Sequence, residues 1–263
     1  MQAVNNEFFN KFAKEYDQDP NCSQGVDIGK AILRELGSLL DKSKTVAMDF
    51  GCGTGLVSQQ MYPHVHQLVG VDASKGMVEV YNEKFAKHEI DNAHAECVEL
   101  TAAESDGSNG EKWVFKDQLD GKRFDLIFTS MAWHHVENID MMAWILKNYL
   151  KDGGKLVVAD IRKNGEQNTS NSDESDKHAH KAHGHQHQHH HQQHESHGAS
   201  HLDGSHTVTH HGGFTDQEIT KNLQQAGLKD IETRMLITIT MKKEEQSKGV
   251  SMDISMAIGT RRD

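Results

Sequence analysis

The chain has 263 residues, of which 35% are hydrophobic, and its formal net charge is −11 with neutral histidines. This length predicts one domain of roughly 200–250 residues plus an insert. The acidic balance argues against a general nucleic-acid-binding protein, whose affinity would come from lysine and arginine side chains that neutralise phosphates. No apolar run of about 18 residues and no signal-like apolar N-terminus is found, so we expect neither membrane spanning nor secretion.

The three cysteines, Cys22, Cys52 and Cys97, are an odd and scattered set. Such a set does not suit a disulfide framework and is typical of a reducing compartment. Together with the absence of a targeting segment, it predicts a cytoplasmic protein.

Residues 1–44 are predicted to form two helices, which we call the N-terminal helical flap. Aromatic side chains from Phe8 to Tyr16 recur at helical spacing, and apolar side chains do so again from Ile28 to Leu36. Between the two stripes, Tyr16-Asp17 and Pro20 interrupt the pattern.

The most informative stretch runs from Thr45 to Gly55. A short apolar run that reaches Phe50 predicts a buried strand, and it contains Asp49 just before three glycines at every second position: Gly51, Gly53 and Gly55. A strand that turns sharply on glycines into a helix brings backbone N–H groups close to a ligand. An ordinary glycine-rich turn and a Rossmann nucleotide loop remain open, although the dinucleotide fingerprint places its third glycine three residues after the second, not two.

A second apolar run, residues 67–72, predicts the next strand and ends on the acid Asp72. In a doubly wound sheet, an acid at this strand end accepts hydrogen bonds from the ribose hydroxyls of an adenosyl ligand. The alternative for Asp72 alone is a charge at a helix N-terminus.

These two stretches resemble motif I and the following D-x-S-x-x-M segment of the class I S-adenosylmethionine-dependent methyltransferases. The resemblance implies an α/β fold with a doubly wound, mostly parallel seven-stranded sheet in the order 3-2-1-4-5-7-6, helices on both faces, and S-adenosylmethionine as cofactor. In that family, a tyrosine before an acid in the flap often faces the cofactor, and the motif methionine lies near the adenine. The predicted cofactor-binding residues are Tyr16, Asp49, Gly51, Cys52, Gly53, Thr54, Gly55, Asp72, Ala73, Ser74, Met77, Glu99, Thr129 and Ser130.

Residues 94–100 are predicted to be the third strand. The family places an acid near the end of this strand against the adenine amino group, and Glu99 is the best-placed candidate. The polar segment 101–112 is predicted to be a loop.

Two later segments strengthen the resemblance. Residues 124–130 resemble the fourth strand of the family, and His134-His135 lie in the segment that follows it. A helix over 139–150 then leads to Gly153-Gly154, which we expect to cap it, and to a buried fifth strand over 155–161.

From 162 to 205 almost no apolar residue occurs, and fourteen of the twenty histidines lie between His178 and His211. Because such a segment cannot offset its ordering entropy by burial, we predict a disordered His-rich insert. Weak transition-metal binding by His178–His197, a pH-dependent charge and plain low-complexity variation remain alternatives.

After the insert, His210-His211 and Phe214 resemble the H-H-x-G-F segment of the family. Thr215 and Glu218 predict a capping box for the next helix. Two terminal strands, 230–241 and 250–260, are expected to pair antiparallel, so the methyltransferase domain would comprise 45–161 and 206–263.

The family's cofactor carries an already activated methyl group, so alignment alone can lower the barrier by around 7–11 kcal/mol. Candidate bases are His134, His135, Asp160, His211 and, with it, His210, since all would lie at the carboxyl edge of the parallel strands. The alternatives are a pocket wall or helix cap for the two adjacent histidines, and a buried hydrogen-bonding acid for Asp160.

Several acceptor classes are disfavoured. Amino-methylating nucleic-acid enzymes need an Asp/Asn-Pro-Pro-aromatic motif after the fourth strand, where this chain has Thr129-Ser-Met-Ala. A small-molecule methyltransferase, similar to those of ubiquinone and menaquinone biosynthesis, is the favoured interpretation. A non-catalytic cofactor fold that carries a His-rich metal-binding or regulatory loop is the alternative.

Overall fold

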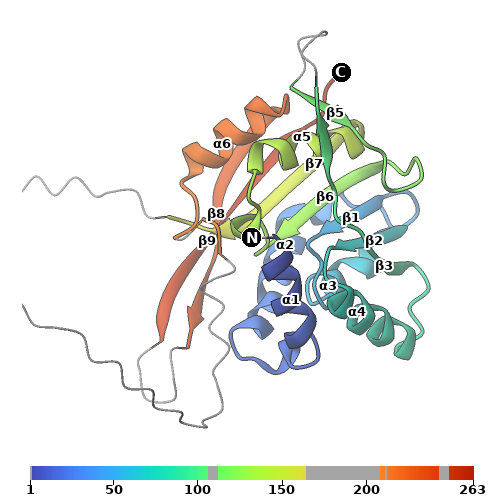
Figure 1. Cartoon of the computed structure of the whole chain (residues 1–263), viewed down its shortest axis with the longest axis vertical. Coiled ribbons are helices and arrows are strands. Elements are labelled where there is room, and N and C mark those ends of the chain that lie inside the picture. Colours follow the sequence, from blue (N-terminus) through green and yellow to red (C-terminus); the bar gives the residue numbers. More distant parts are fainter. Residues whose placement is uncertain (1, 106–111, 164–207, 211, 243–248) are drawn as a thin grey trace, which may run out of the picture. The chain divides into compact units, whose positions relative to one another are not determined.

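A seven-stranded sheet runs through the part of the chain that the computed structural model describes, which is residues 2–105, 112–163, 208–210, 212–242 and 249–263 (Figure 1). Its order is β3-β2-β1-β6-β7-β9-β8, and β9 is the strand that runs antiparallel to the others. The strands are β1 (Val46–Phe50), β2 (Gln67–Asp72), β3 (Ala93–Cys97), β6 (Phe124–Ser130), β7 (Leu150–Ile161), β8 (Lys229–Met241) and β9 (Val250–Thr260). The predicted order is confirmed, because a separate hairpin, β4 (Ala102–Glu104) with β5 (Trp113–Phe115), shifts the later strand numbers by two.

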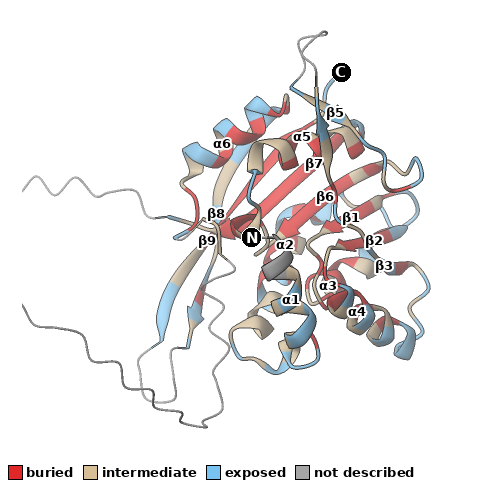
Figure 2. Ribbon diagram, in the orientation of Figure 1, coloured by how far each residue is buried: buried red, intermediate tan, exposed pale blue. Residues whose placement is uncertain are grey.

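Helices cover both faces of this sheet, as predicted. The helices are α1 (Gln2–Phe12), α2 (Gly25–Leu36), α3 (Ser58–Met61), α4 (Lys75–Lys87), α5 (Ile139–Tyr149) and α6 (Asp216–Gln225). Apolar side chains of α2, α3 and α4 share one buried cluster with one face of the strands, and those of α5 and α6 share a second cluster with the other face. Figure 2 shows the buried residues concentrated in the central strands and on the helix sides that face them.

The second helix of the predicted flap belongs to the core. Ile28, Ile32 and Leu36 of α2 are buried, since their spacing places them on one side of the helix, against the sheet. Of the two helices of the predicted flap, α2 therefore forms part of the main layers.

Two local predictions are wrong. The helix before β7 ends at Tyr149, and Leu150 is already extended, so the glycines do not cap it. Gly153 and Gly154 lie inside β7, where a Cβ at Gly154 would come within 2.9 Å of the Phe124 carbonyl oxygen. The expected loop at 101–112 contains β4, because the rings of Trp113 and Phe115 in its partner strand pack on α5.

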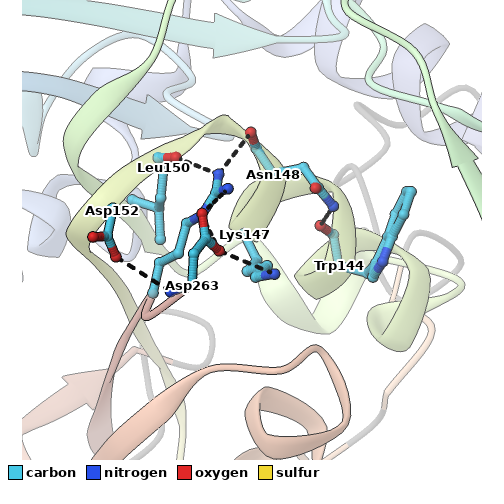
Figure 3. A network of polar contacts seen from close by, with 7 residues as sticks. Trp144, Lys147, Asn148, Leu150, Asp152 and Asp263 are labelled. Carbon is cyan, nitrogen blue, oxygen red and sulfur yellow. Dashed lines mark hydrogen bonds and ion pairs between the residues drawn. The ribbon is translucent and has the colours of Figure 1, made fainter.

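The C-terminal residues contact the end of α5 and the start of β7. Arg261 donates to the carbonyl oxygen of Leu150 at 2.7 Å, and Asp263 lies 3.9 Å from the ammonium of Lys147, a network drawn in Figure 3. These contacts hold the end of β9 beside the start of β7. Within the described residues, no helix is long and apolar enough to cross a membrane.

Candidate functional site

The loop after β1 depends on three glycines with positive φ, at +70° for Gly51, +51° for Gly53 and +86° for Gly55. A Cβ at Gly51 would lie 2.5 Å from that of Ala132, and one at Gly55 would lie 2.6 Å from the ring of Tyr81. A Cβ at Gly53 would meet no atom within 4 Å. The loop is thus packed tightly at both ends and open at its centre.

Asp72 lies at the tip of β2 and holds this open centre. Its Oδ2 accepts a hydrogen bond from the backbone N–H of Gly53 at 2.9 Å, and its Oδ1 accepts one from that of Ser74 at 2.8 Å. Burial raises the pKa of Asp72, although the backbone hydrogen bonds partly oppose that shift. Because a carboxylate oxygen can accept more than one hydrogen bond, both oxygens keep acceptor capacity for a ligand.

Asp49 occupies a different environment, inside β1. The hydroxyl of Ser58 donates to its Oδ2 at 2.7 Å, and burial raises the pKa of Asp49 to about 7. Its observed role is to fix the first turn of α3 behind the glycine loop. A contact between Asp49 and the cofactor stays a prediction.

Other predicted residues lie in the loop after β1 and in the turn between β2 and α4, where they pack against or hydrogen-bond to neighbouring residues. Cys52 is buried, and a Cβ at Gly70 of β2 would lie 2.8 Å from its sulfur. Ser74 caps α4 by accepting a hydrogen bond from the N–H of the buried Met77. The carbonyl oxygen of Ala73 accepts from the Cys97 thiol at 3.8 Å.

The flap contacts both the loop after β1 and the turn between β2 and α4. Thr54, only 1% exposed, donates its hydroxyl hydrogen to Asp17 at 2.5 Å. Asn10 of α1 accepts from the Ser74 hydroxyl at 2.9 Å. Burial raises the pKa of the Tyr16 hydroxyl, and the negative charges around it, that of Asp72 included, raise it further. Whether Tyr16 contacts the cofactor stays a prediction.

The last three predicted cofactor-binding residues are Glu99, after β3, and Thr129 and Ser130, at the end of β6. Glu99 is exposed beyond the end of β3, and its carbonyl oxygen accepts from the Gln118 amide at 2.8 Å. The hydroxyl oxygens of Thr129 and Ser130 are buried without a hydrogen-bond partner among the described residues. Whether these three residues contact the cofactor stays a prediction.

His134 and Asp160 form a buried pair above β6 and β7. Nδ1 of His134 lies 2.7 Å from Oδ1 of Asp160, and the two side chains are 7% and 0% exposed. Asp160 also accepts hydrogen bonds from the backbone N–H groups of Trp133 and Ile161, at 2.8 Å and 2.7 Å. Asp160 thus organises the turn after β6, and its oxygens are occupied by that task.

Two other candidate histidines, His135 and His210, lie next to this pair. The ring of His135 lies 4.1 Å from that of His134 and makes an edge contact with Phe9 of the flap at 5.3 Å. His210 donates from Nε2 to the carbonyl oxygen of Val136 at 3.0 Å. His211 lies outside the described residues. In the part of the chain that is described, no three His, Cys, Asp or Glu side chains are grouped to hold a metal ion.

The edge formed by β1 and β2 fits an adenosyl cofactor. The space in front of Gly53 is open, and the adjacent Asp72 carboxylate has spare acceptor capacity. The Asp72 carboxylate at the tip of β2 suits a ligand that carries ribose hydroxyls and a positive sulfonium. The site lies where the strand order reverses between β1 and β6, the usual ligand position in doubly wound sheets.

The sequence analysis missed the partners that shape these groups. Ser58, Ala132 and Asn10 have no spacing signal that would link them to the motifs they touch. The acid of the flap, Asp17, could be identified only as a neighbour of Tyr16, and its contacts needed the structure.

Comparisons with known proteins agree with this geometry. A family model described as a methyltransferase domain matches residues 26–233. An uncharacterized methyltransferase of Schizosaccharomyces pombe is 32% identical over 220 residues, which are 83% of this chain and 64% of that protein. This chain therefore spans less than two thirds of the length of that relative.

Two further proteins are similar. A ubiquinone biosynthesis O-methyltransferase of Coxiella burnetii is 26% identical over 117 residues, 44% of each chain. The crystal structure of a SAM-dependent methyltransferase from Aquifex aeolicus matches with a TM-score of 0.53 at 15% identity, over 96% of this chain and 98% of that one. This chain belongs to the methyltransferase-domain family with the class I fold, whose cofactor is S-adenosylmethionine.

Proposed function

We propose that this chain transfers the methyl group of S-adenosylmethionine to a small-molecule acceptor. The observation that carries the proposal is the Asp72 carboxylate, held by the N–H groups of Gly53 and Ser74 beside an open loop centre. When bound, the cofactor supplies a methyl group that is already activated by a positive sulfur. The protein then needs to align the acceptor, exclude water and, for a hydroxyl or thiol acceptor, remove a proton.

In this proposal one group of residues binds the cofactor and another lines the acceptor side. Asp72 holds the ribose, and the glycine loop lets its backbone approach the ligand. On the acceptor side, His135 and Phe9 provide a wall of rings that would shield the reaction from water.

His134 is the favoured base in this proposal. An ionised Asp160 can only accept hydrogen bonds, so the nitrogen of His134 that faces it, Nδ1, carries the hydrogen. The other ring nitrogen, Nε2, is then the proton acceptor, and Asp160 is a positioning residue that fixes this tautomer. His135 and His211 remain candidates for contacts with the acceptor.

A methyl-transfer screen tests the proposal. The full chain is incubated with methyl-labelled S-adenosylmethionine and a metabolite extract, and labelled products are separated by size and identified by mass spectrometry. We expect a labelled small molecule with the wild type, none with Asp72→Ala, and a rate about 10²–10⁴-fold lower with His134→Gln.

Asp27→Ala, which removes an exposed acid of α2, is the matched control and should transfer at the wild-type rate. Label that appears only in the protein or nucleic-acid fraction would refute the small-molecule acceptor. Binding of Zn²⁺ or Ni²⁺ without any transfer would favour the metal-binding alternative.

A further inference from the structure

Asp17 connects the flap to two parts of the cofactor site. Its Oδ1 accepts the hydroxyl hydrogen of Thr54 in the glycine loop, and its Oδ2 accepts from the ammonium of Lys84 in α4. The side chains of Lys84 and Asp17 are only 17% and 31% exposed, so solvent screens this ion pair less than it screens a surface pair. Both hydrogen bonds are charge-assisted, the stronger kind.

Thr54, which contacts Asp17, is the residue next to Gly53, where we propose that the ligand binds. Thr54 follows Gly53, whose N–H donates to Asp72. Because the Thr54 side chain is almost fully buried and its hydroxyl bonds to Asp17, the carboxylate of Asp17 fixes the orientation of this part of the loop. The position of the Gly53 N–H therefore depends on a residue of the flap.

A second anchor holds the flap on the other side of Asp72. The side-chain oxygen of Asn10 accepts from the Ser74 hydroxyl at 2.9 Å and from the N–H of Gly76 at 2.7 Å. A Cβ at Gly76 would lie 2.8 Å from the backbone oxygen of Asn10, so α1 lies directly against the start of α4. The flap is thus attached to both turns that flank Asp72.

We propose that Asp17 is a positioning residue for cofactor binding, which holds the glycine loop through Thr54 and ties the flap to it through Lys84. The inference rests on the proposed use of S-adenosylmethionine at this edge. It assigns Thr54 a role that differs from a direct cofactor contact.

A double-mutant cycle read out by binding of S-adenosylhomocysteine tests the inference. Dissociation constants from calorimetry and dissociation rates from stopped flow are measured for the wild type, Asp17→Ala, Thr54→Val and the double variant. We expect each single variant to bind about tenfold more weakly, which is about 1.4 kcal/mol, and to release the ligand faster. The double variant should bind no more weakly than Asp17→Ala alone, because that change already removes the contact with Thr54.

Conservative and control variants separate positioning from folding. Thr54→Ser restores the hydroxyl and should bind within about twofold of the wild type, whereas Asp27→Ala on α2 should change nothing. Asp17→Asn, which keeps the size of the side chain but loses its charge, replaces Asp17→Ala if the latter does not fold.

Two results would overturn the inference. One is an Asp17 variant that binds within about twofold of the wild type, and the other is a double variant that is about 100-fold weaker, since additive losses mean that Thr54 acts independently. A wild-type chain that fails to bind S-adenosylhomocysteine would instead overturn the proposed function, and this inference with it.

Discussion

The three glycines after β1 have the same sign of φ but serve different purposes. Gly51 and Gly55 let neighbouring side chains come closer than any Cβ would allow, at Ala132 and Tyr81 respectively. Gly53 faces open space, so packing does not require its missing side chain, and we propose that a ligand approaches there. A regular glycine pattern in the sequence therefore includes two positions that packing requires and one that it does not.

This difference predicts opposite phenotypes for two alanine variants. Gly55→Ala should lower the free energy of unfolding by roughly 2–5 kcal/mol, through backbone strain and overlap with Tyr81. Gly53→Ala should cost only about 1–2 kcal/mol of stability for its left-handed conformation, but should weaken S-adenosylmethionine binding about tenfold or more. Urea unfolding and calorimetry measure the two effects. Wild-type affinity in Gly53→Ala would show that the ligand does not approach this position.

At the same scale, the sequence located His134 and Asp160 but not their relation. Each was a separate candidate base, because His134 follows one predicted parallel strand and Asp160 lies at the end of the next. In the structure Asp160 orients His134. The backbone N–H of Trp133 reaches Asp160 only because β6 and β7 are adjacent. A division of roles between acid and histidine thus depends on tertiary structure.

Among the elements, an asparagine side chain pairs with the backbone of one residue at each side of the sheet. Asn82 of α4 exchanges two hydrogen bonds with the backbone of Ala95 in the edge strand β3, and Asn21 of the flap does the same with Lys242, just after the edge strand β8. Each amide satisfies backbone groups that would otherwise be open to pairing with another chain at that residue.

The end of β7 and the segment before α6 are joined directly by hydrogen bonds and an ion pair. The N–H of Lys163 donates to the carbonyl oxygen of Phe214 at 2.8 Å, and that of Phe214 donates to Ile161 at 2.9 Å. An ion pair at 2.7 Å joins Arg162 to Asp216 at the start of α6. Arg162 and Lys163 are therefore attached to the segment before α6, and the rest of the predicted insert, from position 164 on, lies outside the described residues.

Because both ends are held in this way, deletion of residues 170–200 should leave the dissociation constant of S-adenosylmethionine within about threefold of the wild-type value. The thermal midpoint should also change little. Calorimetry and thermal unfolding of the full chain and the deletion variant measure both. If the deletion abolishes cofactor binding, the insert takes part in the site. Weak Zn²⁺ binding that disappears with the deletion would support the predicted role of His178–His197.

For the whole molecule, the strand order and the two helical layers could be predicted from the resemblance to the methyltransferase family. Apolar runs indicated β1, β2, β6 and β7, and the glycine turn with Asp72 indicated the proposed ligand edge. Contacts between distant residues could not be predicted. Asp17 lies 37 residues from Thr54 and 67 from Lys84, and no periodicity links such positions. The hairpin of β4 and β5 was missed for the same reason, since aromatic packing on α5 stabilises it.

The central claim is that Asp72 holds the ribose of an adenosyl cofactor at the tips of β1 and β2. Calorimetric titration of S-adenosylmethionine into the wild type and Asp72→Ala tests it most directly, with Asp27→Ala as control. The loss of two hydrogen bonds to a charged group, at roughly 1.5–3 kcal/mol each, predicts binding about 10²–10⁴-fold weaker. A dissociation constant for Asp72→Ala equal to that of the wild type would contradict the account.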